Sequence, residues 1–214
     1  MIIQGTETLT SLIHIISESL LTPVILVLVI FVVIVILCFG GFINEAISRK
    51  TIKSKDLEKL IRDISFSQNS SEIKQYINDS NLFSYQKEVL IRITNNGDIG
   101  SQARKALAAE LITEEESNLI KNTSKTDVLV RLGPIFGLLG TLIPLGPGLA
   151  ALGSGNITTL SESLIIAFDT TVTGLTVGAV AYLISKFKKQ WYENDLITVE
   201  TVAETVLETL NKFR

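Results

Sequence analysis

Residues 23–41 read PVILVLVIFVVIVILCFGG, an apolar block without a charged side chain. A helix rises about 1.5 Å per residue, so about 20 residues cross a hydrocarbon core that is about 30 Å thick. A lone strand in that core would leave its backbone N–H and C=O groups unpaired, so the block is predicted to be helical in spite of its many Val and Ile residues. The block therefore excludes an ordinary soluble domain.

Two further segments, about 129–152 and 160–185, are also long and apolar enough to span a membrane. The first of them is rich in glycine, which lets neighbouring helix backbones approach closely inside a membrane. It also holds prolines, of which Pro144 and Pro147 are predicted to kink or loosen its outer half. The second segment carries two acidic residues and a run of threonines, so one side of it is predicted to face protein or water.

The basic residues predict the orientation of the chain. All 19 Lys and Arg residues lie within positions 49–131, 186–189 and 212–214. By the positive-inside rule the N-terminus is outside and the C-terminus is cytoplasmic, which suits a multi-pass protein of the cytoplasmic (inner) membrane. The absence of Lys and Arg from residues 1–22 argues against a signal peptide.

These features predict an all-α polytopic membrane protein with three transmembrane helices and a helical cytoplasmic domain. The predicted segments, in chain order, are an outer interfacial amphipathic helix at 1–22, a transmembrane helix at 23–42, the cytoplasmic helical domain at 43–128, a transmembrane helix at 129–152, an external turn at 153–159, a transmembrane helix at 160–185 and a cytoplasmic helical tail at 186–214.

The polar segments show helical periodicity and no phosphate-binding loop. In the tail, apolar residues recur at alternating spacings of three and four, as in a coiled coil. They are Leu196, Val199, Ala203, Val206, Leu210 and Phe213. Two interpretations remain open at this point: self-association of the tail, or packing of the tail against the first cytoplasmic segment.

The composition excludes several kinds of function. The one cysteine, Cys38, rules out an internal disulfide and a multi-cysteine metal site. The one histidine, His14, leaves little for a metal site or a catalytic triad, so we expect no enzyme activity, no metal and no cofactor. The net charge of −3 does not suggest nucleic-acid binding.

Helical geometry sorts the third span into two faces at about 100° per residue. Small residues gather on one face, namely Ala167, Thr171, Gly174 and Gly178. Polar residues gather on roughly the opposite face, namely Glu162, Asp169, Thr173 and Thr176. An ionised Asp inside a membrane costs about 2.5–3.5 kcal/mol on insertion scales, so Asp169 is a candidate functional residue. Glu162 has an alternative, because at the outer interface its charge is cheap.

The second and third spans together resemble the MotA/TolQ/ExbB proton channel family. The resemblance rests on Gly133-Pro134 followed by Gly137-Leu138-Leu139-Gly140-Thr141, and on Thr171-Val172-Thr173-Gly174-Leu175 in the third span. The topology is similar as well, with three spans and a large cytoplasmic insertion after the first, which is the TolQ/ExbB layout.

The resemblance implies a pentamer of this chain around a dimer of a small single-span partner that is similar to ExbD, TolR or MotB and carries a membrane Asp. Protons or sodium ions would pass at the subunit boundary and drive mechanical work, such as protein transport. Thr141 and Thr171 would be the pore-lining pair, because hydroxyl groups both donate and accept hydrogen bonds. The family's Glu in the third span falls on Ile166, and Glu162 lies one turn further out.

The predicted sites are therefore two sets of residues. The ion pathway comprises Thr141, Thr171, Asp169, Thr173 and Glu162, and the helix-packing positions are Gly133, Gly137, Gly140, Gly174 and Gly178. The first alternative is a membrane scaffold that packs in the same way without conducting ions. The second is a membrane enzyme, against which the single histidine argues.

Overall fold

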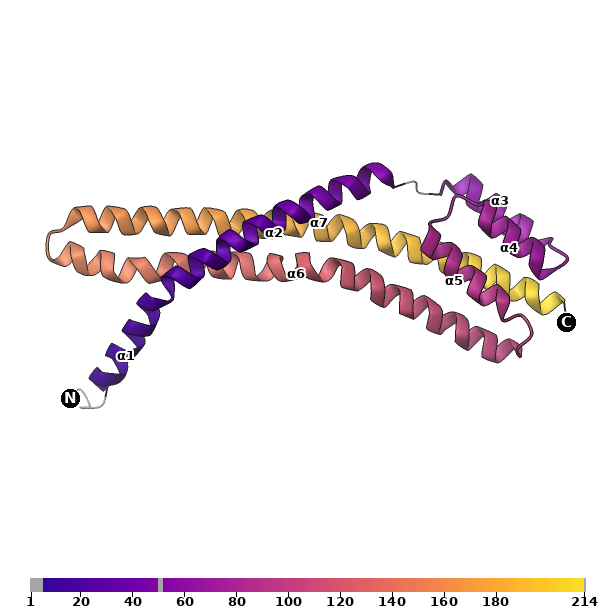
Figure 1. Ribbon diagram of the computed structural model, residues 1–214, viewed down its shortest axis with the longest axis horizontal. Coiled ribbons are helices and arrows are strands. Elements are labelled where there is room, and N and C mark those ends of the chain that lie inside the picture. The colour runs from indigo at the N-terminus through magenta and orange to yellow at the C-terminus, as the bar shows by residue number, and fades with distance from the viewer. Residues whose placement is uncertain (1–5, 50–51, 214) are drawn as a thin grey trace. The chain divides into compact units, whose positions relative to one another are not determined.

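The computed structural model describes residues 6–49 and 52–213, and in these ranges every regular element is a helix (Figure 1). The helices are α1 (Thr6–Ser19), α2 (Leu21–Ser48), α3 (Ser54–Ser65), α4 (Ser70–Asp79), α5 (Ser84–Asn95), α6 (Ser101–Gly153) and α7 (Ile157–Lys212). By length and composition three helical stretches are able to cross a membrane, within Thr8–Ser48, α6 and α7. The predicted all-α membrane fold with three spans is thus confirmed.

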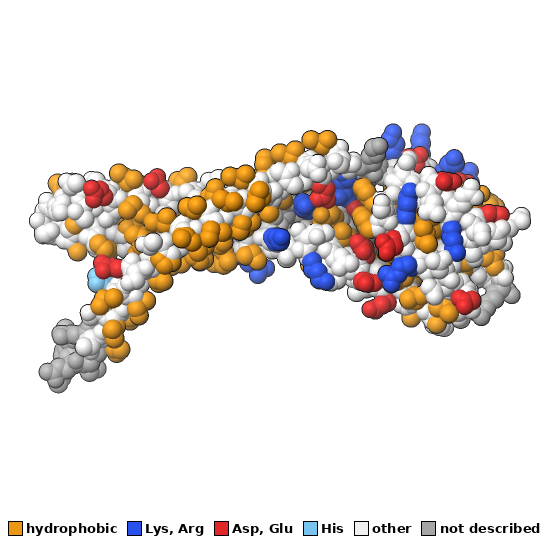
Figure 2. All heavy atoms as spheres, viewed as in Figure 1, with side chains coloured by type: hydrophobic (Ala, Val, Ile, Leu, Met, Phe, Trp, Pro, Cys, Tyr) orange, Lys and Arg blue, Asp and Glu red, His pale blue; other side chains and the backbone are white. Residues whose placement is uncertain are grey.

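The chain divides into two compact units. The membrane unit comprises Met1–Asn44 and Ser124–Lys186, and the polar unit comprises Glu45–Thr123 and Phe187–Arg214. Helices α6 and α7 contribute to both units, because each continues without a break from an apolar segment into a charged one. Figure 2 shows hydrophobic side chains along α2, whereas Lys, Arg, Asp and Glu side chains gather on the polar unit.

In the membrane unit, α6 and α7 run antiparallel and are joined by a turn at residues 154–156 (Figure 1). Gly155 has a φ of +78°, a left-handed conformation that favours glycine. Its N–H donates to the carbonyl of Leu152 at 3.0 Å, and the N–H of Asn156 donates to that of Ala151 at 2.9 Å. These two bonds form the Schellman motif that ends α6.

Helix α6 contains three prolines, Pro134, Pro144 and Pro147, and remains helical through all of them. An interior proline removes a backbone hydrogen bond and usually kinks a helix in water. In a membrane, neighbouring helices and side chains satisfy the freed carbonyl groups, so proline is better tolerated there. The predicted loosening at Pro144 and Pro147 does not interrupt the helix.

Glycines bring α6 and α7 into close contact. A Cβ atom added at Gly140 would lie 2.5 Å from the Cβ of Thr170, and one added at Gly137 would lie 3.2 Å from the Cα of Gly174. A Cβ added at Gly174 would lie 2.5 Å from the carbonyl oxygen of Gly133. Larger side chains therefore do not fit between the two backbones at this depth.

Helix α2 packs on one side of this pair. Val35 is buried with Leu129 of α6 and with Val177 and Ala181 of α7. The rings of Phe31 and Phe136 meet edge to face, with centroids 5.5 Å apart. Since higher numbers on α2 meet lower numbers on α6, these two helices run antiparallel.

The polar unit has an aliphatic core built from α3, α4, α5 and the stretches of α6 and α7 that belong to this unit. Its side chains are buried almost completely: Leu60, Ile64, Ile73, Ile77, Leu82, Val89, Leu90, Ile93, Ala108, Leu111, Val199, Val202, Ala203, Val206 and Leu210. Each of the three short helices buries one apolar face, as their periodicity predicts.

The core decides between the two interpretations of the tail. Val199, Ala203, Val206 and Leu210 are buried against the helices of the first polar segment, while Phe213 remains 40% exposed. The coiled-coil-like spacing therefore describes packing within the chain, and most of the apolar tail face is already covered.

Candidate functional site

Thr171 of α7 is the most unusual polar residue of the membrane unit. Its side chain is half-buried, and its Oγ1 atom is buried without a hydrogen-bond partner in the described structure. In contrast, Thr170 beside it donates to two carbonyl groups of its own helix, those of Ile166 at 2.9 Å and Ala167 at 3.0 Å. An unpaired buried hydroxyl costs about 1–3 kcal/mol, and a rotation of the side chain toward a carbonyl of its own helix or toward a group outside the chain would remove this cost.

Thr141 of α6 is half-buried as well, and its hydroxyl group donates to the carbonyl of Leu138 at 2.6 Å. This is the common back-bond of a threonine in a helix. The oxygen atom still has lone pairs that accept hydrogen bonds, so the hydroxyl remains able to bind water or a carboxyl group.

Helical angles place Thr141 and Thr171 along the same edge of the α6–α7 pair. On α6, Thr141 lies about 40° to one side of Gly137, and Phe136 lies about 100° to the other side. On α7, Thr171 and Thr173 likewise lie on opposite sides of Gly174, which packs against Gly137.

Helix α2 covers one of these two edges. Phe31 of α2 contacts Phe136 of α6. Helix α2 also forms a groove with the Thr173 side of α7, and this groove is lined by Val32, Val35, Ile36 and Phe39 of α2 and by Val172, Thr173, Thr176, Val177 and Val180 of α7. The edge that carries Thr141 and Thr171 is therefore the one away from α2, which we call the free edge. The structure thus brings Thr141 and Thr171 to one edge and Thr173 to the other.

The other predicted pathway residues do not reach the free edge. Thr173 donates to the carbonyl of Asp169 at 2.7 Å, so its hydroxyl is bound to its own helix. Asp169 is exposed on the single chain, about 160° around α7 from Thr171, and Glu162 is exposed too. Neither carboxylate has a hydrogen-bond or ion-pair partner among the described residues.

The five predicted packing glycines lie at the contact between α6 and α7, together with Gly148, whose added Cβ would lie 2.8 Å from that of Ser163. By contrast, a Cβ added at Gly146 or Gly153 would have nothing within 4 Å. Close approach is thus confined to one stripe of α6, and the same stripe fixes the position of the free edge.

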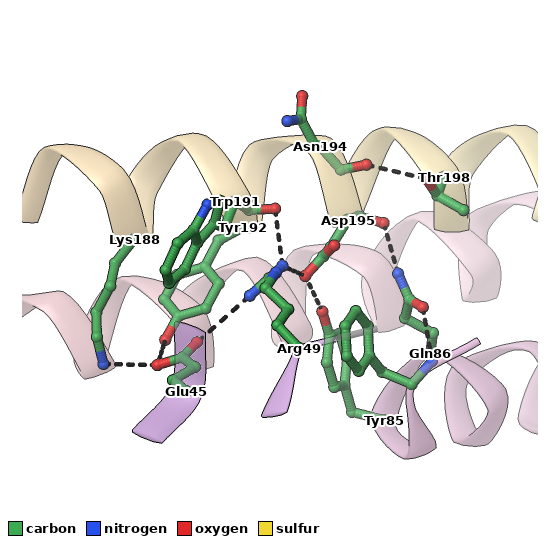
Figure 3. Close-up of polar contacts among 11 residues, drawn as sticks. Glu45, Arg49, Tyr85, Gln86, Lys188, Trp191, Tyr192, Asn194, Asp195 and Thr198 are labelled. Atoms are coloured by element: carbon green, nitrogen blue, oxygen red, sulfur yellow. Dashed lines mark hydrogen bonds and ion pairs between the residues drawn. The ribbon is translucent and has the colours of Figure 1, made fainter. Parts of the chain in front are cut away.

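A second polar site lies in the polar unit, and it is not among the sites that the sequence predicts (Figure 3). Arg49, just after the end of α2, forms an ion pair with Asp195 of α7, and both side chains are less than 10% exposed. Arg49 also donates to Glu45 at 3.3 Å and to the carbonyl of Trp191 at 3.2 Å. Glu45 pairs with Lys188 at 2.8 Å.

Aromatic rings surround the guanidinium group of Arg49. Its Cζ atom lies 5.1 Å from the ring centroids of Phe83 and Trp191 and 5.8 Å from that of Tyr192, distances suited to cation–π attraction. Arg is favoured at such sites because its planar, weakly hydrated group stacks on rings while it binds carboxylates. We call this site the Arg49 cluster.

Helix α5 joins the Arg49 cluster through Tyr85 and Gln86. The hydroxyl group of Tyr85 donates to the carboxylate of Asp195 at 2.5 Å, and the amide of Gln86 donates to the backbone carbonyl of Asp195 at 3.0 Å. Burial, and then the hydrogen bond to Asp195, raise the pKa of Tyr85 well above its ordinary value. The cluster therefore ties α5 and α7 to the segment that follows α2.

Two signals in the sequence point to this cluster. Arg49 is the first basic residue after the first span, and Trp191 and Tyr192 follow the basic stretch 186–189 after one intervening residue. Basic and aromatic residues gather where a helix leaves the membrane. The pairing of Arg49 with Asp195, 146 positions away, is a tertiary contact that neither signal predicts.

Comparison with known families agrees with these observations. The model of the MotA/TolQ/ExbB proton channel family matches residues 73–201, which include most of α4, all of α5, the contact glycines of α6 and α7 and the free edge. No curated protein matches the chain. Among the described residues, no group of three His, Cys, Asp or Glu side chains is arranged to hold a metal ion.

Proposed function

The chain belongs to the MotA/TolQ/ExbB proton channel family, and we propose on that basis that it is the ion-channel subunit of a membrane complex driven by an ion gradient. The observation that carries this proposal is the unpaired hydroxyl of Thr171 at the free edge. A chain that kept this edge against lipid would offer that hydroxyl no partner beyond the carbonyl groups of its own helix.

The free edge supports a pathway between neighbouring helices. Thr141 and Thr171 offer two hydroxyl groups at the boundary of α6 and α7, and hydroxyl groups can hold a water chain or bind a protonated carboxyl group. Neither group titrates in a useful pH range, so a titratable partner must supply the proton. In our proposal this partner is a small single-span protein with an Asp at membrane depth.

Exposed charges support a ring of several copies. Asp169 and Glu162 lie on the surface of the single chain, and at membrane depth a charged residue that faces lipid costs about 2.5–3.5 kcal/mol. A neighbouring copy that covers Asp169 would remove it from lipid. We propose a pentamer around two copies of the partner, in the inner membrane, with the N-terminus outside and the polar unit in the cytoplasm.

The position of Asp169 refines its role in this proposal. It lies about 160° around α7 from Thr171 of the same chain, so it does not act beside that hydroxyl within one subunit. In a ring it is available to a neighbouring copy instead. Asp169→Asn separates the two possibilities, because a role in ion movement needs the charge and a packing role needs only the hydrogen-bonding shape.

The test is proton flux into vesicles that contain this chain and a co-expressed single-span protein with a membrane Asp, measured with an enclosed pH-sensitive dye. We expect Thr171→Val, which keeps the side-chain shape, to reduce flux about tenfold or more, since a hydrogen bond to a charged group contributes about 1.5–3 kcal/mol. Asp169→Asn is expected to reduce flux while the ring still assembles.

Thr176→Val is the matched control, because Thr176 is a threonine of the same helix that is bonded to the carbonyl of Val172 and lies on the α2 side. It should retain wild-type flux. Equal flux in Thr171→Val and the wild type would refute the channel role of the free edge and favour the alternative, a membrane scaffold. Equal flux in Asp169→Asn would limit Asp169 to packing.

A further inference from the structure

Between α2 and α6 the membrane unit has an apolar groove with a volume of about 670 Å³. It is lined by Phe31, Ile34, Leu37, Cys38, Ser124, Lys125, Val128 and Leu129. Binding sites for small molecules usually have volumes of about 300–1,000 Å³. The groove belongs to neither the free edge nor the α2 side of α7, so the proposed ion pathway does not use it.

The groove lies at membrane depth. Its wall on α2 runs from Phe31 to Cys38, inside the uncharged block, and is about 10 Å long at 1.5 Å per residue. Leu37 and Val128 on its walls are 69% and 50% exposed, so the groove opens on the surface of the unit. In a bilayer, acyl chains are the molecules that meet such a surface.

One end of the groove carries a positive charge. Because α2 and α6 are antiparallel, Ser124 and Lys125 lie toward Cys38, at the end where the first span approaches the basic segments of the chain. Lys125 is exposed and makes no ion pair among the described residues. The nearby carboxylate of Asp127 accepts a hydrogen bond from Ser185 of α7.

The groove is apolar and ends at an ammonium group that has no counter-ion among the described residues. A lipid with an apolar acyl chain and a negatively charged head group complements both features. Basic pockets between transmembrane helices bind anionic head groups, and a Lys near the membrane surface contributes to attraction of anionic lipids. We propose that this groove binds an anionic phospholipid, with an acyl chain between α2 and α6 and the phosphate group on Lys125. The inference does not depend on ion conduction.

Cys38, the only cysteine of the chain, is a built-in reporter because it lies half-buried in the groove wall. The full-length chain is labelled there with bimane and placed in phosphatidylcholine nanodiscs. These contain increasing mole fractions of either brominated phosphatidylglycerol or brominated phosphatidylcholine, and bromine quenches the label on contact. We expect the anionic lipid to reach half-quenching at about a fivefold lower mole fraction, as one Lys near a membrane surface gives about 1 kcal/mol.

Lys125→Gln should remove the preference between the two lipids. Lys186→Gln is the matched control, because Lys186 follows Ser185, which bonds to Asp127, and so lies at the same level on another helix, outside the groove. It should keep the preference. Both variants are compared with the wild type by gel filtration and thermal unfolding, so that loss of folding is recognised. Native mass spectrometry of unlabelled protein should show the same order of phosphatidylglycerol retention.

Three results would overturn the inference. Equal quenching by both lipids in the wild type would show that the charge selects nothing. If the Lys186→Gln variant lost the preference for the anionic lipid as the Lys125→Gln variant does, the preference would come from the general surface charge and not from the groove. Absence of quenching by either lipid would show that another protein chain covers the groove. Proton flux is not measured in this test, so its failure leaves the proposed function untouched.

Discussion

The membrane unit and the polar unit hold their helices together in opposite ways. In the polar unit, large aliphatic side chains such as Ile64, Ile73 and Leu90 fill the space between helices. In the membrane unit, α6 and α7 meet where side chains are smallest, at Gly137, Gly140 and their partners. Burying an aliphatic side chain is favourable when it leaves water, but it gains little when it leaves lipid, so close backbone contact replaces it.

Polar groups differ between the units for the same reason. The polar unit buries a network of charges around Arg49, whose members satisfy one another. The membrane unit mostly uses hydroxyl groups bonded to their own helix, as at Thr170, Thr173 and Thr176. Against this pattern, the unpaired hydroxyl of Thr171 is conspicuous, and the comparison therefore identifies it without reference to any relative.

The largest effect should come from the charge network of the polar unit. Arg49→Met leaves the carboxylate of Asp195, which is 5% exposed, without its cation. Removing one partner of a buried ion pair costs about 3–5 kcal/mol. We expect the free energy of unfolding of the full chain in detergent to fall by that amount, measured by urea titration with the fluorescence of Trp191.

The control for this prediction is Arg92→Met, which breaks an exposed ion pair with Glu114 in the same unit and should cost less than about 1 kcal/mol. Replacing both partners, as Arg49→Met with Asp195→Leu, should restore much of the lost stability, because no buried charge is then left unpaired. A loss no larger than that of Arg92→Met would show that the Arg49 cluster contributes little.

The next effect tests the glycine contact of the membrane unit. Gly140→Ala places a Cβ atom 2.5 Å from that of Thr170, so the two helices must separate, and overpacking of this kind costs about 1–3 kcal/mol. Unfolding in increasing sodium dodecyl sulfate, followed by circular dichroism, measures the change.

Gly146→Ala is the matched control on the same helix, since nothing lies within 4 Å of its added Cβ. Alanine is the better helix former by about 1 kcal/mol, so this variant should be as stable as the wild type or slightly more stable. Equal destabilisation by the two substitutions would mean that helix propensity, and not close approach, decides the outcome.

The smallest effect concerns alkaline pH. Folding raises the pKa of Tyr85, so above the unfolded tyrosine pKa of about 10 the unfolded chain loses a proton that the folded chain retains. The stability contributed by Tyr85 is therefore complete below pH 10 and decreases as the pH rises further. Tyr85→Phe should make the decline of the urea midpoint between pH 9 and 11.5 shallower, and an unchanged slope would contradict the prediction.

The sequence predicts the spans well because the bilayer imposes one requirement on every residue of a span. An uncharged stretch such as 23–41 has to be a helix of nearly fixed length, whatever its neighbours are. The same argument predicts the residues at which the helices begin and end less accurately. The turn expected at 153–159 occupies only 154–156, since Gly155 ends α6 sharply and Asn156 accepts a hydrogen bond from the N–H of Thr159 at the start of α7.

The candidate sites were predictable to different degrees. Thr141 and Thr171 follow from motifs, and helical geometry already places Thr173 on another face of its helix than Thr171. Which edge of the α6–α7 pair is covered depends on where α2 packs, and the sequence does not reveal that. The Arg49 cluster depends on contacts such as Arg49 with Asp195 that join distant parts of the chain. Periodicity carries no information about such pairs.

The polar core joins residues 60–111 with Val199–Leu210, and this has a consequence for biosynthesis. A growing chain releases α3, α4 and α5 from the ribosome long before their last packing partner, with two membrane spans still to be made. Until then side chains such as Ile64 and Leu90 have no complete core to enter, and exposed apolar surface of this kind invites aggregation and chaperone binding. Closure of this core would then mark a chain whose two later spans have already been synthesised.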